Sequence, residues 1–132
     1  MKTIQLFTVF LLFFFAESTV CKGQDLNPVI QFAQKELDLG TIMSGDSAIC
    51  FFEFFNTGTY PLMLTEAKTT CGCTVAELPQ IPLAPGERDR IRIQLDTTDK
   101  IGRIRKVITV YSNALNSEER IAVSVLVKKD LE

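Results

Sequence analysis

The amino-acid sequence predicts an all-β protein, an immunoglobulin-like antiparallel β-sandwich of about seven strands that follows an N-terminal signal peptide. Three observations predict this fold class. Apolar and polar residues alternate with a period of two, turn residues separate the alternating runs, and no window of a dozen residues shows helical spacing. About seven short strands at regular intervals in roughly a hundred residues are typical of immunoglobulin-like sandwiches.

The chain begins with a segment typical of export signals. A short basic start precedes the eleven uncharged residues Leu6–Ala16, which are too few to span a bilayer. We therefore expect a signal peptide over residues 1–23, followed by a single immunoglobulin-like domain over residues 24–132. The alternative is lipoprotein processing with lipidation of Cys21, although the preceding valine is not the usual small residue. Either route predicts a periplasmic or cell-envelope location, with a lipid anchor in the second.

The first three strands are expected at Val29–Phe32, Leu37–Leu39 and Ser47–Phe55. The third is apolar on both faces, because phenylalanines occupy odd and even positions alike. We expect its second face, which carries Phe51 and Phe55, to be covered by a neighbouring loop or by the N-terminal segment. The alternative is an exposed aromatic patch for a partner or for self-association.

Four further strands are expected around Leu62–Leu64, Arg88–Leu95, residues 104–112 and Glu119–Val127. The second and the last of these alternate cleanly, while residues 104–112 are less regular, with Ile108 and Val110 inward and Tyr111 outward. Turn residues separate these runs, at Pro85-Gly86 and at Asn56-Thr57-Gly58. The second of these turns is expected to contain a residue in the left-handed conformation.

Composition excludes several classes of function. The chain has 14 basic and 16 acidic residues, a net charge of −2, and no cluster of lysine and arginine that would bind nucleic acid. It has no histidine, which excludes histidine-based triads and proton shuttles. No glycine-rich phosphate loop is present, and no second apolar stretch is long enough to span a membrane. We expect no enzyme and no cofactor.

The candidate site is the run Cys71-Gly72-Cys73-Thr74. In an oxidising compartment two close cysteines can form a disulfide, a metal clip or a redox device. Cys50 adds a third thiol to the chain that begins at residue 24.

Three arrangements of these thiols remain open at this point. Cys71 and Cys73 can pair with each other, in a small ring that is easily reduced. One of them can pair with Cys50 and brace the loop to the core. The two can also bind Cu(I), although the chain offers few other soft ligands.

Six motifs, in this order along the chain, resemble those of domain of unknown function 1573. They are Phe52–Gly58, Pro61-Leu62, Cys71–Thr74, Pro85-Gly86, Gly102–Lys106 and Ile108–Asn113. The expected motif and turn positions among them are Asn56, Gly58, Gly72 and Thr74. The resemblance implies an exported bacterial protein with an immunoglobulin-like fold, related to the sandwiches of ciliary and centrosomal proteins, and it implies no biochemical role. Cys50 departs from the family pattern and is expected to serve as a small core residue.

These observations predict a non-enzymatic binding or structural module of the bacterial cell envelope, with a protein partner or an envelope assembly as its target. The alternative function is thiol redox exchange or Cu(I) handling by the Cys71/Cys73 pair.

Overall fold

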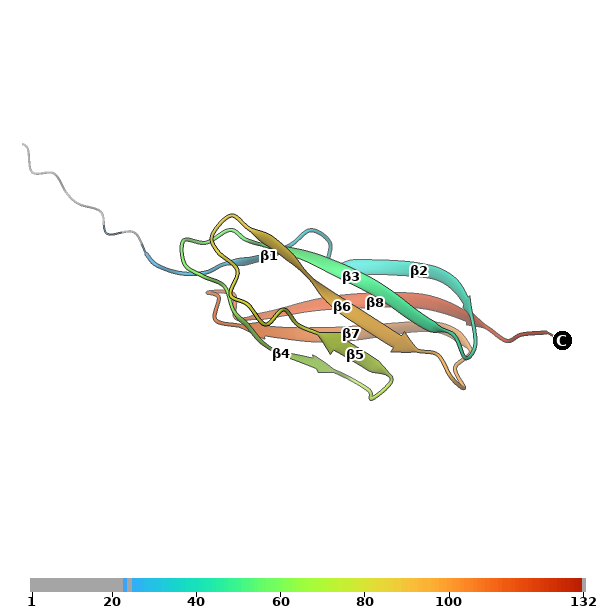
Figure 1. Ribbon diagram of the computed structural model, residues 1–132. Helices are drawn as coiled ribbons and strands as arrows, with labels where there is room; N and C mark the ends of the chain where they lie inside the picture. The colour runs from blue at the N-terminus through green and yellow to red at the C-terminus, as the bar shows by residue number, and fades with distance from the viewer. Residues whose placement is uncertain (1–22, 24, 132) are drawn as a thin grey trace, which may run out of the picture.

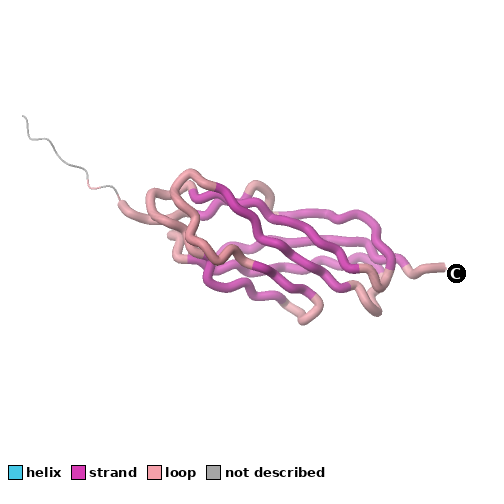
Figure 2. Tube along the Cα trace, viewed as in Figure 1, coloured by secondary structure: helices cyan, strands magenta, loops and turns pink. Residues whose placement is uncertain are grey.

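The computed structural model describes Gly23 and residues 25–131, which form eight strands and no helix (Figures 1 and 2). The strands are β1 (Ile30–Phe32), β2 (Glu36–Met43), β3 (Ser47–Asn56), β4 (Leu64–Thr69), β5 (Thr74–Glu77), β6 (Arg88–Asp96), β7 (Gly102–Ser112) and β8 (Glu118–Lys128). The predicted all-β sandwich is confirmed. The predicted signal peptide and the predicted lipidation of Cys21 lie outside the described residues, apart from Gly23.

The strands form two four-stranded sheets that face each other (Figure 1). Sheet A has the order β1-β3-β6-β5, and sheet B has the order β2-β8-β7-β4. Every pairing is antiparallel except that of β2 with β8, which is parallel. The N-terminal segment thus begins in sheet A and crosses to sheet B, so that its two strands cover one edge of each sheet.

The core lies between the sheets and consists of the inward positions of the alternating strands. Phe52 and Phe54 of β3 are 1% exposed, and Ile91, Ile93 and Leu95 of β6 are between 0% and 1% exposed. Sheet B contributes Ile108, Val110, Ile121, Val123, Val125 and Val127, each exposed by 1% or less. Burying one such side chain stabilises the fold by about 1.5–3 kcal/mol. The predicted inward positions of Ile108 and Val110 are confirmed.

Three elements differ from the sequence-based expectation. β2 is longer than predicted. The prediction ended at Leu39 because a bulge interrupts the alternation there: Gly40 has a φ of 72° and the register with β8 shifts between Asp38 and Thr41. β5 was not predicted, because its four residues are too few to establish a period. The strand expected at Leu62–Leu64 begins only at Leu64 and continues to Thr69 as β4, while Leu62 forms an isolated bridge with Leu83.

The loops gather at the two ends of the sandwich, and the C-terminal segment leaves from the end at the right of Figure 1. The loop between β4 and β5, which carries the cysteine pair, lies toward this same end. Among the described residues, no helix is long and apolar enough to cross a membrane.

Candidate functional site

The cysteine pair lies in the loop that leads from β4 in sheet B to β5 in sheet A. The Thr69 hydroxyl lies within donating distance of the Cys71 carbonyl at 3.1 Å and of the Thr74 carbonyl at 3.3 Å. The N–H of Asp96 at the end of β6 donates to the Cys73 carbonyl at 2.8 Å. These bonds hold the loop against both sheets, so the pair has a defined position.

Cys71 and Cys73 meet across Gly72. Their Sγ atoms are 2.04 Å apart, the separation of a disulfide, and their Cα atoms are 5.4 Å apart. Both residues are half-buried, and the buried hydroxyl of Thr74 lies 3.9 Å from each Sγ. Cys73 also packs against the small apolar cluster that contains Ala48 and Leu95. The pair is therefore open to solvent on one side and fixed to the core on the other.

Cys50 lies apart from this pair. It is a free, buried thiol on the inner face of β3, opposite Ile93 of β6. Burial raises the pKa of the Cys50 thiol to about 11, which keeps it protonated and unreactive. No group of three or more histidine, cysteine, aspartate or glutamate side chains is placed to hold a metal ion in the described part of the chain.

Lys106, the last residue of the Gly102–Lys106 motif, lies on β7 beyond the last residue that pairs with β4. Lys106 is directly opposite Val123, which is 0% exposed, so it occupies the inner face of β7 between Ile104 and Ile108. Thr69, the last residue of β4, pairs with Ile108. Lys106 therefore lies just beyond the end of β4, where the loop crosses between the sheets. The signal in the sequence is the lysine that breaks the alternation of residues 104–112.

Asn56, expected as a turn residue, is a buried hub at the opposite end of the sandwich. Its side-chain oxygen accepts hydrogen bonds from the N–H groups of Gly58 at 3.0 Å and Val29 at 3.4 Å. Its amide nitrogen donates to the carbonyls of Tyr60 at 2.7 Å and Leu83 at 2.9 Å. Asn56 is 0% exposed, and it joins three segments that are distant in sequence.

The prediction of a left-handed residue at Asn56-Thr57-Gly58 is wrong, because none of these three residues has a positive φ. Gly58 is required for a different reason. A Cβ added there would lie 2.3 Å from the Asn27 carbonyl oxygen and 2.5 Å from the Val29 nitrogen. At Gly72, φ is not positive either, and an added Cβ would meet nothing within 4 Å. The first glycine thus permits a close approach of two backbone segments, and the second does not.

The outer face of sheet A exposes apolar side chains. Ile49 is 48% exposed, Phe51 is 44% exposed and Val75 is 53% exposed. The expectation that this face of β3 is covered is therefore wrong at Ile49 and Phe51, while Phe55 is half-buried. The physical reason is that the N-terminal segment pairs along the sheet edges as β1 and β2 and does not cross the face of β3.

The outer face of sheet B has a different character. Arg103 and Arg105 of β7 pair with Asp38 and Glu36 of β2 at 3.5 and 2.6 Å. The ammonium group of Lys68 lies 5.3 Å from the ring centroid of Tyr111. Charged side chains thus cover much of this face, so the two outer faces of the sandwich are chemically distinct.

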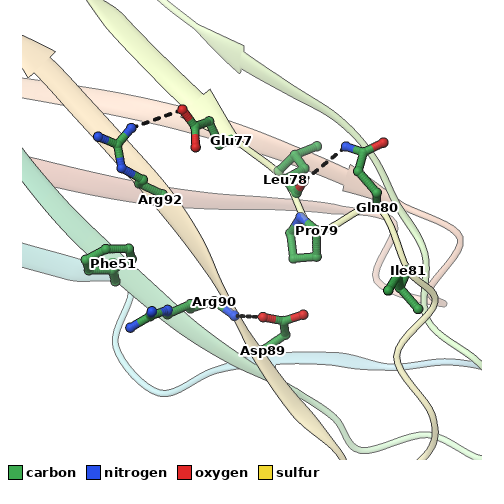
Figure 3. A pocket seen from close by; sticks show the side chains of 9 residues that line it. All are labelled: Phe51, Glu77, Leu78, Pro79, Gln80, Ile81, Asp89, Arg90 and Arg92. Carbon is green, nitrogen blue, oxygen red and sulfur yellow. Dashed lines mark hydrogen bonds and ion pairs between the residues drawn. The ribbon is translucent and has the colours of Figure 1, made fainter.

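A shallow hollow of about 410 Å³ lies beside Phe51 on sheet A (Figure 3). The Arg90 guanidinium lies 4.3 Å from the Phe51 ring centroid, and Arg92 pairs with Glu77 at 3.0 Å. The segment after β5, with Leu78 and the 79% exposed Ile81, forms its other wall (Figure 3). The hollow therefore combines apolar walls with an arginine that forms no ion pair among the described residues.

Comparison with solved structures shows a shared fold. A protein of unknown function from Porphyromonas gingivalis W83 is similar with a TM-score of 0.68 and 21% identity, over 83% of this chain and 51% of that one. This chain thus spans about half the length of that structure. The seventh PapD-like domain of human CEP192 is similar with a TM-score of 0.66 and 11% identity, over 83% of this chain and 92% of that domain. The secreted serine protease VesC of Vibrio cholerae is similar with a TM-score of 0.56 and 14% identity, over 75% of this chain and 23% of that one.

These likenesses show the fold alone, an immunoglobulin-like sandwich of the PapD-like kind. No curated protein sequence matches this chain. The family model described as "Protein of unknown function (DUF1573)" matches residues 30–127, from the start of β1 to the last but one residue of β8. The resemblance of the motifs around Asn56 and the cysteine pair is thereby confirmed, and the chain belongs to the DUF1573 family.

Proposed function

We propose that this protein is an exported, non-enzymatic binding module of the bacterial cell envelope that binds another protein through the outer face of sheet A. The observation that carries the proposal is the exposure of Ile49, Phe51 and Val75 on a regular strand surface. Apolar side chains gathered on one face favour burial against a partner, at about 25 cal/mol per Å² of apolar surface.

The polar groups around these side chains support the same function. The cores of protein interfaces are enriched in aromatic residues and arginine. Phe51 and Arg90 supply this pair at the centre of the face, and Arg92 and Glu77 supply a charged rim. The charged outer face of sheet B lacks a comparable group of exposed apolar side chains among the described residues.

The test is recovery of crosslinked complexes from envelope fractions of the native host. The Phe51→Asp variant should lose the partner that the wild-type protein captures, because it removes the aromatic ring and places a carboxylate in the contact. The matched control is Ile101→Asp, since Ile101 is 67% exposed but lies in the turn between β6 and β7. Equal capture by wild type and Phe51→Asp would remove the outer face of sheet A as the binding surface.

A second candidate function is thiol exchange or Cu(I) handling at Cys71 and Cys73. It is favoured by the half-exposed position of both residues in a loop, in contrast to the buried Cys50. Replacing both cysteines with serine should abolish disulfide exchange or copper retention and leave the fold intact. A collapse of thermal stability in that variant would instead assign the pair a structural role.

A further inference from the structure

The inner side of the sandwich becomes polar where the cysteine loop crosses between the sheets. Thr69 and Lys106 face inward from sheet B, because they lie opposite or beside the buried residues Ile108 and Val123. Thr74 faces inward from sheet A, where it lies opposite Leu95 and is 5% exposed. Thr69 and Thr74 contact the cysteine loop directly, and Lys106 lies two residues along β7 from the partner of Thr69, on the same inner face.

Lys106 requires a particular explanation. Its neighbours on the same face of β7 are Ile104 and Ile108, and Ile104 packs against the same cluster as Cys73. A lysine on an inner face must extend its ammonium group toward water, since a buried, unpaired charge is costly. β4 ends at Thr69, which pairs with Ile108, so no residue of β4 pairs with β7 at Lys106, and the chain continues from Thr69 directly into the cysteine loop. Lys106 forms no ion pair within residues 25–131.

We propose that Cys71 and Cys73 form a thiol–disulfide exchange site whose thiolate is stabilised by Lys106 and Thr74, and that its substrate is a dithiol on another exported protein. A lysine beside a cysteine favours the thiolate, which is the reactive and leaving form of sulfur. The Thr74 hydroxyl, 3.9 Å from each Sγ, supplies a hydrogen-bond donor to the same sulfurs. This inference deepens the second candidate function and is independent of binding by sheet A.

The reaction is a two-electron exchange that balances without a cofactor. A thiolate of the partner attacks Sγ of Cys71, the Cys71–Cys73 bond breaks, and Cys73 leaves as a thiolate beside Lys106. The second thiol of the partner loses its proton and attacks the mixed disulfide, which releases Cys71. The partner is oxidised from dithiol to disulfide, and Cys71 and Cys73 are reduced and take up the two protons.

Cys71 is the attacked sulfur because Cys73 is the more firmly fixed of the two. Cys73 packs against the core cluster, and its carbonyl accepts the hydrogen bond from Asp96 that continues the β5–β6 ladder. A leaving thiolate at Cys73 therefore remains in place near its stabilising groups. Cys50 takes no part, because it is buried on β3.

The test is the rate and equilibrium of reduction of the folded protein in glutathione buffers, followed by alkylation and intact mass. In the Lys106→Met variant, reduction should be on the order of fivefold slower, with the equilibrium shifted toward the disulfide by a similar factor. Methionine keeps the length of the side chain and suits an inner face, so this variant should fold. Lys106→Arg should retain the wild-type rate.

The matched control is Lys68→Met, which removes a lysine of the adjacent strand that stacks on Tyr111 at the outer face. It should leave both quantities unchanged. A Cys73→Ser variant should accumulate a mixed disulfide with oxidised glutathione on Cys71. Equal rates in Lys106→Met and wild type, or reduction of the wild-type pair only after denaturation, would overturn the proposal. Neither result would bear on capture of a partner by Phe51.

Discussion

Gly58 and Gly72 both lie in motifs of the family, but their backbone surroundings differ. The N–H groups of Thr57 and Thr59 donate to the carbonyls of Val29 and Asn27, each at 2.9 Å. Gly58 lies between these bonds, where the N-terminal segment approaches so closely that no side chain fits. Gly72 faces open space, and its conformation does not require glycine.

We therefore expect Gly58→Ala to lower the free energy of unfolding by about 3 kcal/mol, since the added methyl group must push two backbone segments apart. Gly72→Ala should change it by less than about 0.5 kcal/mol. Urea unfolding of the two variants measures the difference. Similar midpoints for both variants would contradict the close approach at Gly58.

Asn56 shows at the same scale how a buried polar residue organises a fold. Each of its four hydrogen bonds reaches a backbone group, and together they satisfy both its acceptor and its donor. The sequence indicated a turn here from residue type alone. It could not indicate burial, because the bonding groups of Val29 and Leu83 come from segments 27 residues away on either side.

At the scale of the strand, alternation predicted correctly which residues face the core in the long strands. It failed to predict the full extent of the edge strands β2 and β5. β6 and β8 were predicted almost to the residue, because each has one buried face over many residues. β5 was missed because it is short, and β2 was truncated because its bulge interrupts the period. In β7, Lys106 made the pattern irregular, because it is a charged residue on the inner face opposite the buried Val123.

The short edge strand β1 depends on a side chain from another loop. The side-chain oxygen of Asn116 accepts the Ile30 N–H at 3.2 Å, and its amide nitrogen donates to the Ile30 carbonyl at 2.7 Å. The amide group thus pairs with Ile30 as a neighbouring strand would. β1 has only three residues and, among the described residues, pairs with β3 alone. The Asn116 amide therefore satisfies backbone groups on the otherwise unpaired side of this edge strand.

Replacement of Asn116 with alanine should therefore release β1 before the rest of sheet A. We expect faster hydrogen exchange at the Ile30 amide and a loss of about 1 kcal/mol in the free energy of unfolding. Hydrogen exchange followed by NMR measures both local and global protection. Asn113→Ala is the control, since Asn113 bonds to residues 61–63 and not to β1. Unchanged protection of Ile30 in Asn116→Ala would show that the pairing with β3 alone holds the strand.

At the scale of the whole molecule, the crossing of the N-terminal segment from sheet A to sheet B joins the two sheets. The segment between β1 and β2 is held to β8 by Lys35, whose ammonium group lies 2.5 Å from the Glu119 carboxylate. The hydrogen bond from Lys35, helped by one from Asn116, holds the pKa of Glu119 below its usual value. The charged form of Glu119 is therefore favoured in the folded state.

This shift predicts a stability that depends on pH. Because the folded pKa lies below the unfolded one, the contribution of Glu119 is complete above the unfolded value of about 4.3 and is lost as the pH falls through the folded value. The Lys35→Met variant should lose less stability than wild type over that acidic range. Thermal unfolding from pH 6 to pH 3 measures the two slopes, and Lys129→Met is the control, since Lys129 follows the end of β8. Parallel curves for Lys35→Met and wild type would exclude the pair as a source of acid sensitivity.

The sequence by itself determined the class of fold, the inward face of each long strand, the positions of the main turns and the family. These properties follow from a period of two and from turn residues, which act over a few neighbours in the chain. Only the tertiary structure decided that Ile49 and Phe51 are exposed, that Gly58 is needed for a close approach, and that Lys106 lies on the inner face of β7 beyond the end of β4. Each depends on which strands occupy the sheet edges and where a loop crosses between sheets, and those arrangements arise from contacts between segments far apart in the sequence.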